Sequence, residues 1–269
     1  MGNAIRYLKR EISTVDPDIT DEDAKALLAD RIDNFIRDQI IVADHIIAAN
    51  ALEKIQPNDV ILAYGGSSVI LQAFEAAQEK GICFRVVIVD SGPRFEGKHM
   101  VRKLVRKGVE CTYVPLAGVA YIAKEATKVF LGAHGLFSNG TLLARAGTAM
   151  VALAGHHQRL PVIVCCETYK FSDKVRLDSV VWNEIGDARD LLAISTLEYS
   201  AVSAQAATEE EAKNQVIDDN LTSHSNLHFL NLLYDLTPAD YITVVVTEVG
   251  LIPCTSVPVV LREYAPLIQ

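Results

Sequence analysis

The sequence predicts an α/β fold in which a parallel sheet is covered by helices on both faces and is preceded by an N-terminal helical segment. From Asp59 onward, short apolar runs alternate with stretches of helical periodicity, which is the order expected of a parallel sheet with right-handed crossovers. The runs Val129–Gly132 and Val162–Cys166 are apolar on both faces. Such runs are typical of strands buried between two layers of helices.

The first 56 residues are expected to form a small helical domain or the remnant of one. Asn3 to Ser13 reads as a short charged helix. Thr20 and the acids that follow it resemble a capping box, and apolar residues continue at helical spacing to about Ile55. Pro57-Asn58 ends this region, so we expect residues 1–56 and 57–269 to be separate domains.

Three strand–helix pairs are expected next, each a run of apolar residues followed by an amphipathic stretch. They are Val60–Ala63 with Ser67–Lys80, Phe84–Val89 with Glu96–Lys107, and Glu110–Val114 with Val119–Glu125.

The stretch from Val129 to Phe171 is expected to be the central unit of the sheet. Its first strand, Val129–Gly132, is followed by a glycine-containing turn from Gly135 to Gly140. Apolar residues from Thr141 to Ala154 recur at helical spacing and predict a helix there. The turn would lie at the carboxyl end of a strand, which is the edge where open α/β sheets usually bind ligands.

The C-terminal third is expected to be less regular. Residues 200–226 are polar and acidic and predict a solvated insert. Leu230–Leu236 is expected to be a strand or a strand-like loop, and Thr237-Pro238 to begin a helix. Thr255–Tyr264 is expected to form the C-terminal helix.

Composition excludes several classes of function. The net charge of −9 argues against a surface dedicated to nucleic acid or to anionic membranes. Five cysteines without CxxC spacing are expected to be small buried hydrophobes in a reducing compartment. No uncharged apolar run has membrane-spanning length, so we expect a cytoplasmic (cytosolic) protein.

Two glycine-containing turns are candidate anion sites. Gly65-Gly66-Ser67-Ser68 follows a strand and opens a helix, so it could hold phosphate with backbone N–H groups or simply be a capped tight turn. Gly135 to Gly140 has the glycine spacing of a P-loop, but Thr141 stands where the lysine is required. Nucleotide hydrolysis is therefore not expected.

Other candidates have plainer explanations. His224 and His228 are four residues apart, but no third ligand is near, so no metal is expected. Cys165 and Cys166 would point to opposite faces of a strand and so form no joint site. One basic helix is either a solvated face or a docking surface for an acidic partner. Its cations are Arg94, Lys98, Arg102, Lys103, Arg106 and Lys107.

Three stretches resemble a known family. They are NGTLLARAGTAMVAL with LPVIVCCETYKF, NLLYDLTPADYITVVVTEVGLIP, and TSVPVVLREY. Together they resemble the delta-type regulatory subunits of eukaryotic translation initiation factor 2B, from about Asp59 to the end. The resemblance implies Rossmann-like architecture and a regulatory, non-catalytic subunit of the guanine nucleotide exchange factor for initiation factor 2. It also implies that the subunit senses the phosphorylated alpha subunit of initiation factor 2, and that it needs no cofactor.

The wider family includes sugar-phosphate aldose–ketose isomerases, which are the alternative. Those enzymes carry a cysteine near Gly65 and an aspartate where His134 stands here. They also carry a phosphate-binding glutamine where Glu96 stands, and Asn-Lys where the chain has Ala144-Arg145. The resemblance therefore implies a degenerate ligand pocket without catalytic residues. Its residues are Gly65, Ser67, Ser68, Glu96, His134, Asn139, Arg145 and Asp235.

The same resemblance implies partners and an interface. The partners are the beta and alpha subunits, the catalytic gamma and epsilon subunits, and initiation factor 2 itself. The segment Leu230, Asn231, Leu232, Leu233 and Tyr234 is expected at a subunit contact, and the alternative is that these residues fill the domain's own core.

Overall fold

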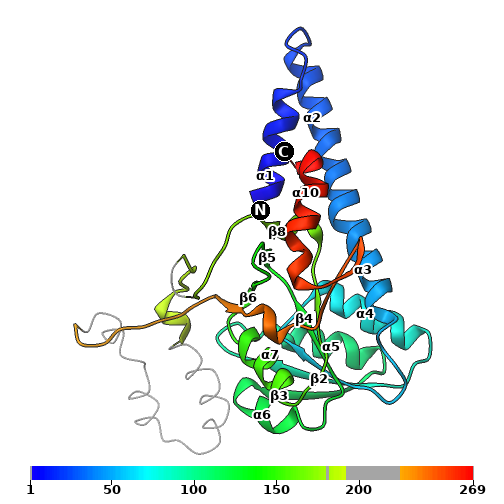
Figure 1. The fold of residues 1–269 in the computed structure, drawn as a ribbon, viewed down its shortest axis with the longest axis vertical. Helices are drawn as coiled ribbons and strands as arrows, with labels where there is room; N and C mark the ends of the chain where they lie inside the picture. The colour runs from blue at the N-terminus through cyan, green and yellow to red at the C-terminus, as the bar shows by residue number, and fades with distance from the viewer. Residues whose placement is uncertain (1, 180–181, 192–224, 269) are drawn as a thin grey trace, which may run out of the picture.

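The main sheet of the protein has seven strands, and the computed structural model describes residues 2–179, 182–191 and 225–268 (Figure 1). The strand order is β11-β10-β7-β4-β1-β2-β3, and every neighbouring pair is parallel except β10 with β11. The strands are β1 Val60–Tyr64, β2 Arg85–Asp90, β3 Glu110–Pro115, β4 Lys128–Gly132, β7 Val162–Cys165, β10 Val244–Thr247 and β11 Gly250–Ile252. The predicted α/β class with a parallel sheet is confirmed.

Helices cover both faces of this sheet, because its central strands are apolar on both sides. Leu62 and Leu131 point into one buried cluster, which the helices α6 (Val119–Ile122), α7 (Thr148–His157) and α10 (Val257–Ile268) help to form. Ile61 and Phe130 point into the other, with residues of α3 (Ala43–Leu52), α4 (Ser68–Glu79) and α5 (Gly97–Arg106). Each such fully buried side chain stabilises the fold by about 1.5–3 kcal/mol.

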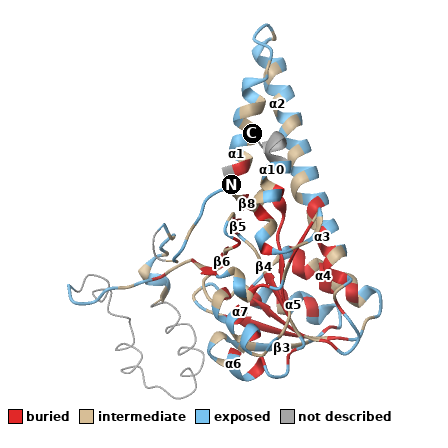
Figure 2. Ribbon diagram, in the orientation of Figure 1, coloured by how far each residue is buried: buried red, intermediate tan, exposed pale blue. Residues whose placement is uncertain are grey.

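The N-terminal helical region is present as expected. Helix α1 (Gly2–Ser13) and helix α2 (Asp21–Ile36) form an extended projection. Most of its residues are exposed or intermediate in burial, drawn pale blue and tan in Figure 2. The backbone N–H of Asp23 donates to the Thr20 hydroxyl, which caps α2 as the sequence predicts. A π-helical segment, η1 (Arg37–Val42), joins α2 to α3. Helix α3, before residue 56, and helix α4, after it, pack into the same buried cluster. The division into two domains at residue 56 stays a prediction.

A second, smaller sheet was not predicted. It has the order β8-β5-β6-β9, with β8 Phe171–Ser172, β5 Gly135–Phe137, β6 Leu142–Arg145 and β9 Tyr234–Thr237. The expected helix from Thr141 is therefore wrong in its first part, and half of the expected turn is strand β5. The helix starts only at Thr148, after Gly147 has turned the chain with a φ of 108°. Leu142 and Ala144 are buried while Leu143 is half-buried, which is the alternation of a strand. This alternation covers too few residues to be recognised in the sequence.

The expected helix at Thr237-Pro238 is also wrong. Pro238 has an extended ψ of 144°, and only a 3₁₀ turn, η5 (Ala239–Tyr241), follows it. The chain then forms β10, whose three consecutive valines favour a buried strand, and the antiparallel edge strand β11. Only the C-terminal part of the strand predicted at Leu230–Leu236 is present, as part of β9. The C-terminal helix is confirmed as α10, behind the short 3₁₀ helix η6 (Cys254–Ser256).

The cysteines divide by position. Cys165, Cys166 and Cys254 are buried as expected, whereas Cys83 is exposed because it lies in the loop between α4 and β2. Most of the predicted insert 200–226 lies outside the described residues. In the ranges that the structure does describe, no helix is both long and apolar enough to cross a membrane.

Candidate strand-end pocket

A cavity of about 220 Å³ lies at the carboxyl ends of β1, β4 and β7. Six of the eight predicted pocket residues line it: Gly65, Ser67, Ser68, Glu96, His134 and Arg145. A second cavity of about 50 Å³ adjoins it and shares Tyr64, Gly65, Glu96 and Arg145. The sheet edge predicted to carry a ligand site does therefore carry a cavity.

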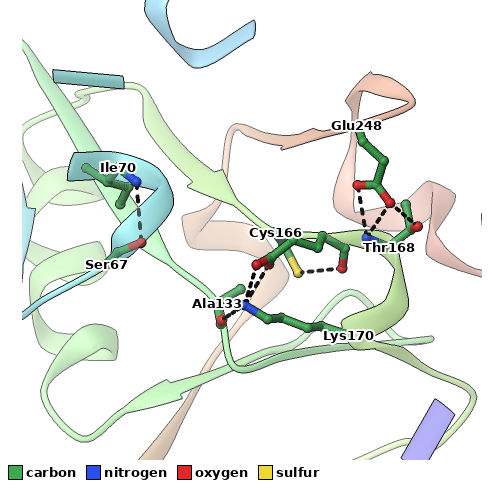
Figure 3. A network of polar contacts seen from close by, with 8 residues as sticks. Ser67, Ile70, Ala133, Cys166, Thr168, Lys170 and Glu248 are labelled. Atoms are coloured by element: carbon green, nitrogen blue, oxygen red, sulfur yellow. Dashed lines mark hydrogen bonds and ion pairs between the residues drawn. The ribbon is translucent and has the colours of Figure 1, made fainter. Parts of the chain in front are cut away.

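The glycine turn after β1 forms one wall of the pocket. Gly65 adopts a φ of 61°, and a β-carbon on Gly66 would lie 3.0 Å from the carbonyl oxygen of Glu96. Ser67 caps α4, because its hydroxyl accepts a hydrogen bond from the Ile70 N–H at 3.5 Å (Figure 3). The turn is thus a capped tight turn, and its residues line the cavity at the positive end of α4.

Both cationic side chains of the pocket are neutralised by neighbouring carboxylates. Arg145 donates to the two carboxylate oxygens of Glu96 at 3.2 and 2.9 Å. Lys170 lies 2.6 Å from one oxygen of Glu167 and donates to the other at 2.8 Å. An incoming anion would have to compete with these carboxylates for each cation.

His134 stands at the rim of the pocket, where the isomerases carry an aspartate. Its ring lies against Tyr234, with the centroids 4.5 Å apart, and the Arg145 guanidinium covers the same tyrosine ring at 5.1 Å. Partial burial lowers the pKa of His134, and the charges of Arg145 and Lys170 lower it further. A neutral imidazole packed on an aromatic ring does not replace a catalytic carboxylate.

The thiol nearest the cavity also cannot replace the missing catalytic cysteine. Cys165 lines the floor of the pocket at the end of β7. Burial raises the pKa of its thiol to about 12, with the charge of Glu167 adding to the effect. The thiolate that proton transfer or nucleophilic attack requires is therefore not accessible near neutral pH.

Two predicted residues lie away from the cavity and have structural roles. Asn139, in the β5–β6 turn, donates to the carbonyl oxygen of Arg176 at 3.1 Å. Asp235 accepts from the N–H groups of Gly147 and Ala149 at 2.7 and 2.9 Å, and so caps α7. Burial raises the pKa of Asp235 to about 6 although these two hydrogen bonds lower it.

Sequence reasoning missed three pocket residues: Tyr64, Glu167 and Lys170. Tyr64 ends β1, and its hydroxyl lies 2.6 Å from the Ser91 hydroxyl and also bonds to the Ala146 carbonyl. Burial raises the pKa of Tyr64 to about 12. Glu167 and Lys170 directly follow a strand predicted to be central, so the strand-end rule could have found them.

The remaining candidates stay apart from the pocket. Cys165 and Cys166 belong to opposite buried clusters, as predicted. His224 lies outside the described residues, and among those described no three His, Cys, Asp or Glu side chains are grouped to hold a metal. The basic side chains of α5 are exposed, and Lys107, just after this helix, pairs with Glu79 at 3.0 Å. Both the solvated face and the docking surface fit this exposure, so the docking surface stays a hypothesis.

The five predicted interface residues do not share one environment. Leu230 is 65% exposed, whereas Asn231 and Tyr234 are buried and Leu232 and Leu233 are half-buried. Asn231 donates to the carbonyl oxygen of Asp187 at 2.9 Å and so fastens its segment to the 182–191 stretch. Tyr234 belongs to β9 and packs against the pocket residues His134 and Arg145.

The fold and the pocket together define a class of protein. It is a parallel α/β protein with an enzyme-like strand-end cavity whose charged groups are paired with one another. The chain belongs to the initiation factor 2 subunit family, because the profile of that family matches residues 1–254.

Individual relatives are consistent with the delta-type resemblance. The chain is 46% identical to translation initiation factor eIF2B subunit delta of Schizosaccharomyces pombe over 98% of this chain and 54% of that protein. A ribose 1,5-bisphosphate isomerase of Archaeoglobus fulgidus is 31% identical, over 78% of this chain and 59% of the enzyme. The chain thus spans about half the length of the curated relatives it matches.

A solved structure shares the fold over most of the chain. The tetrameric eIF2B-beta2-delta2 complex from C. thermophilum contains a chain that matches with a TM-score of 0.73 and 32% identity. The match covers 92% of this chain and 69% of that one. Sequence and structure comparisons both favour the translation-factor branch of the family over the enzyme branch.

Proposed function

We propose that this chain is a regulatory, non-catalytic subunit of the guanine nucleotide exchange factor for translation initiation factor 2. It acts in the cytosol by assembling with sister subunits, first the beta subunit and then the alpha subunit and the catalytic gamma and epsilon subunits. Within that assembly it contributes to sensing initiation factor 2 that is phosphorylated on its alpha subunit.

The observation that carries this proposal is the state of the pocket. Its two cations are paired with Glu96 and Glu167, and its thiol, Cys165, is fully buried with a raised pKa. An aldose–ketose isomerase must bind a phosphate group and move protons, and these groups are arranged for neither. The fold therefore serves another purpose than turnover.

Association is supported by an apolar surface next to the pocket. Leu177, Trp182, Ile185 and Leu230 are 89%, 81%, 69% and 65% exposed, respectively. A soluble protein rarely exposes several large apolar side chains on neighbouring stretches unless a partner covers them. Leu232 pairs with Ile185 in an isolated antiparallel bridge, so the predicted interface segment adjoins Ile185 of this exposed group. The beta2-delta2 assembly of the related structure supports a beta subunit as that partner.

The test is sedimentation of the chain with the beta subunit after the substitution Leu230→Glu. Leu230 is preferred to Leu232 because its exposed side chain contributes little to the isolated fold. An unpaired charge buried in the interface should cost about 3–5 kcal/mol, which lowers affinity at least a hundredfold. Val105→Glu on α5, where the side chain is 55% exposed, is the matched control and should assemble normally. Normal assembly of the Leu230→Glu chain would show that this segment is not part of the interface.

A further inference from the structure

The short turn that follows β7 is a junction between the pocket and the N-terminal helices. It comprises Glu167 and the 3₁₀ helix η3 (Thr168–Lys170). On the pocket side, Lys170 donates to the carbonyl oxygen of Ala133 at 3.3 Å (Figure 3). On another side, the Glu248 carboxylate, just after β10, accepts from the Thr168 N–H at 3.0 and 3.1 Å and from the Thr168 hydroxyl.

Three N-terminal elements meet the same turn. Asn3 of α1 is buried and donates to the carbonyl oxygens of Tyr169 and Phe171 at 2.8 and 2.6 Å. Phe35 of α2 lies edge-on to the Tyr169 ring, with the centroids 6.4 Å apart. Asp44 of α3 lies within hydrogen-bond reach of Glu167. This turn is therefore one of the places where the N-terminal helices are fixed to the sheet, beside the packing of α3 against α4 and β10.

The contact between Asp44 and Glu167 joins two carboxyl groups. One oxygen of each, Oδ1 of Asp44 and Oε2 of Glu167, is buried and has no hydrogen-bond donor within the described part of the chain. The Glu167 oxygen does contact the Lys170 ammonium at 2.6 Å, but outside hydrogen-bond geometry. The other Glu167 oxygen accepts from Lys170 at 2.8 Å, whereas the buried Asp44 oxygen has no donor, and a single proton between the two carboxyl groups would provide the missing hydrogen bond.

The surrounding charges do not remove the need for that proton. Glu167 and Glu248 both disfavour the ionised form of Asp44, and Lys170 is the cation that opposes them. Tyr169, the other titratable group at this contact, has a raised pKa and is neutral there. Three carboxylates thus face one ammonium. Burial is the largest cause that raises the pKa of Asp44 to about 7, followed by its hydrogen bond to Glu167.

We propose that Asp44 and Glu167 share one proton, and that this proton forms a pH-dependent latch between helix α3 and the turn at the pocket floor. With the proton present, α3 is held on the turn, and α1 and α2 are held with it. Without the proton, two carboxylates repel each other across the contact and α3 opens more readily. The sign follows from the raised pKa: the latch is complete in acid and is lost as pH rises through about 7.

The test is hydrogen–deuterium exchange of the whole chain between pH 5 and 8.5, corrected for the intrinsic exchange rate. We expect the opening equilibrium of α3 amides to increase about tenfold per pH unit from pH 5 to 7 and to level off above that, as one proton requires. Asp44→Asn should abolish this dependence, because the amide donates to Glu167 at every pH. Asp38→Asn is the matched control, since Asp38 is an exposed acid on the preceding turn and should leave the profile unchanged.

A second measurement keeps the proposal testable if a variant fails to fold. Carbon-13 NMR of the aspartate carboxyl groups in the unmodified chain should show one group with a midpoint near pH 7, far above the ordinary value of about 3.9. A carboxyl signal assigned to Asp44 that titrates below about pH 5 would overturn the latch. So would an Asp44→Asn chain that retains the pH-dependent exchange of α3.

Discussion

Neutralising Glu96 should convert the pocket into an anion site. Glu96 holds the Arg145 guanidinium through two hydrogen bonds, and both side chains are about one-third exposed at 33% and 32%. Glu96→Gln leaves one acceptor for Arg145 and removes the negative charge. The cation then faces a cavity already lined by the first turn of α4, whose N–H groups favour anions.

The expected size of the effect can be worked from this geometry. Because the pair is partly screened by solvent, its loss should destabilise the fold by only about 1 kcal/mol. In a protein of this size that lowers the melting temperature by about 2–4 °C. If phosphate binds the variant with a dissociation constant of about 1 mM, 10 mM phosphate restores about 1.4 kcal/mol. Phosphate should therefore return the variant to the melting temperature of the unsubstituted chain.

Thermal unfolding with and without 10 mM phosphate tests this reasoning. The control is Glu125→Gln, which removes a similar carboxylate that pairs with Arg85 at 2.7 Å outside the pocket. Phosphate should stabilise the Glu96 variant and leave the control and the unsubstituted chain unchanged. Equal stabilisation of all three chains would show that Glu96 does not guard the pocket, and no stabilisation of any would show that Arg145 is not its anion-binding group.

Two further predictions concern the pocket wall and the absence of turnover. Gly147→Ala should lower the free energy of unfolding, measured with denaturant, by about 3 kcal/mol or more. The new β-carbon would lie 2.2 Å from the Tyr64 hydroxyl, and the backbone there has a φ of 108°. A loss below about 1 kcal/mol would mean that the tyrosine moves freely. The purified chain should not convert ribose 1,5-bisphosphate or methylthioribose 1-phosphate in a coupled assay, and His134→Ala should change nothing. Turnover that disappears in the His134 variant would instead establish an enzyme.

The main sheet could be predicted because each of its central strands is a recognisable apolar run in the sequence. Val129–Gly132 and Val162–Cys166 are long enough and apolar enough to be recognised without knowledge of their neighbours. Strand β6 has four residues and pairs with β9, which follows it far along the chain. Such short strands are specified by pairing rather than by local pattern, which is why a helix was expected in part of that region.

The pocket was predictable in position and not in detail. The rule that ligands bind at strand ends located Gly65, Ser67 and Ser68 at the cavity. The pairing of Arg145 with Glu96 joins residues 49 positions apart, so it depends on how the strands are ordered. The half-buried Asp44 and the buried Glu167 were missed because a lone acid in a helix or after a strand usually faces solvent.

Native mass spectrometry of this chain, alone and mixed with the beta subunit, tests the central claim most directly. A partner-binding subunit should form a mixed complex with equal numbers of the two chains, up to two copies of each as in the related beta2-delta2 structure. An obligate contact of this kind should bury about 2,000 Å² or more and so survive transfer to the gas phase. Two chains that remain separate at micromolar concentration would contradict the account.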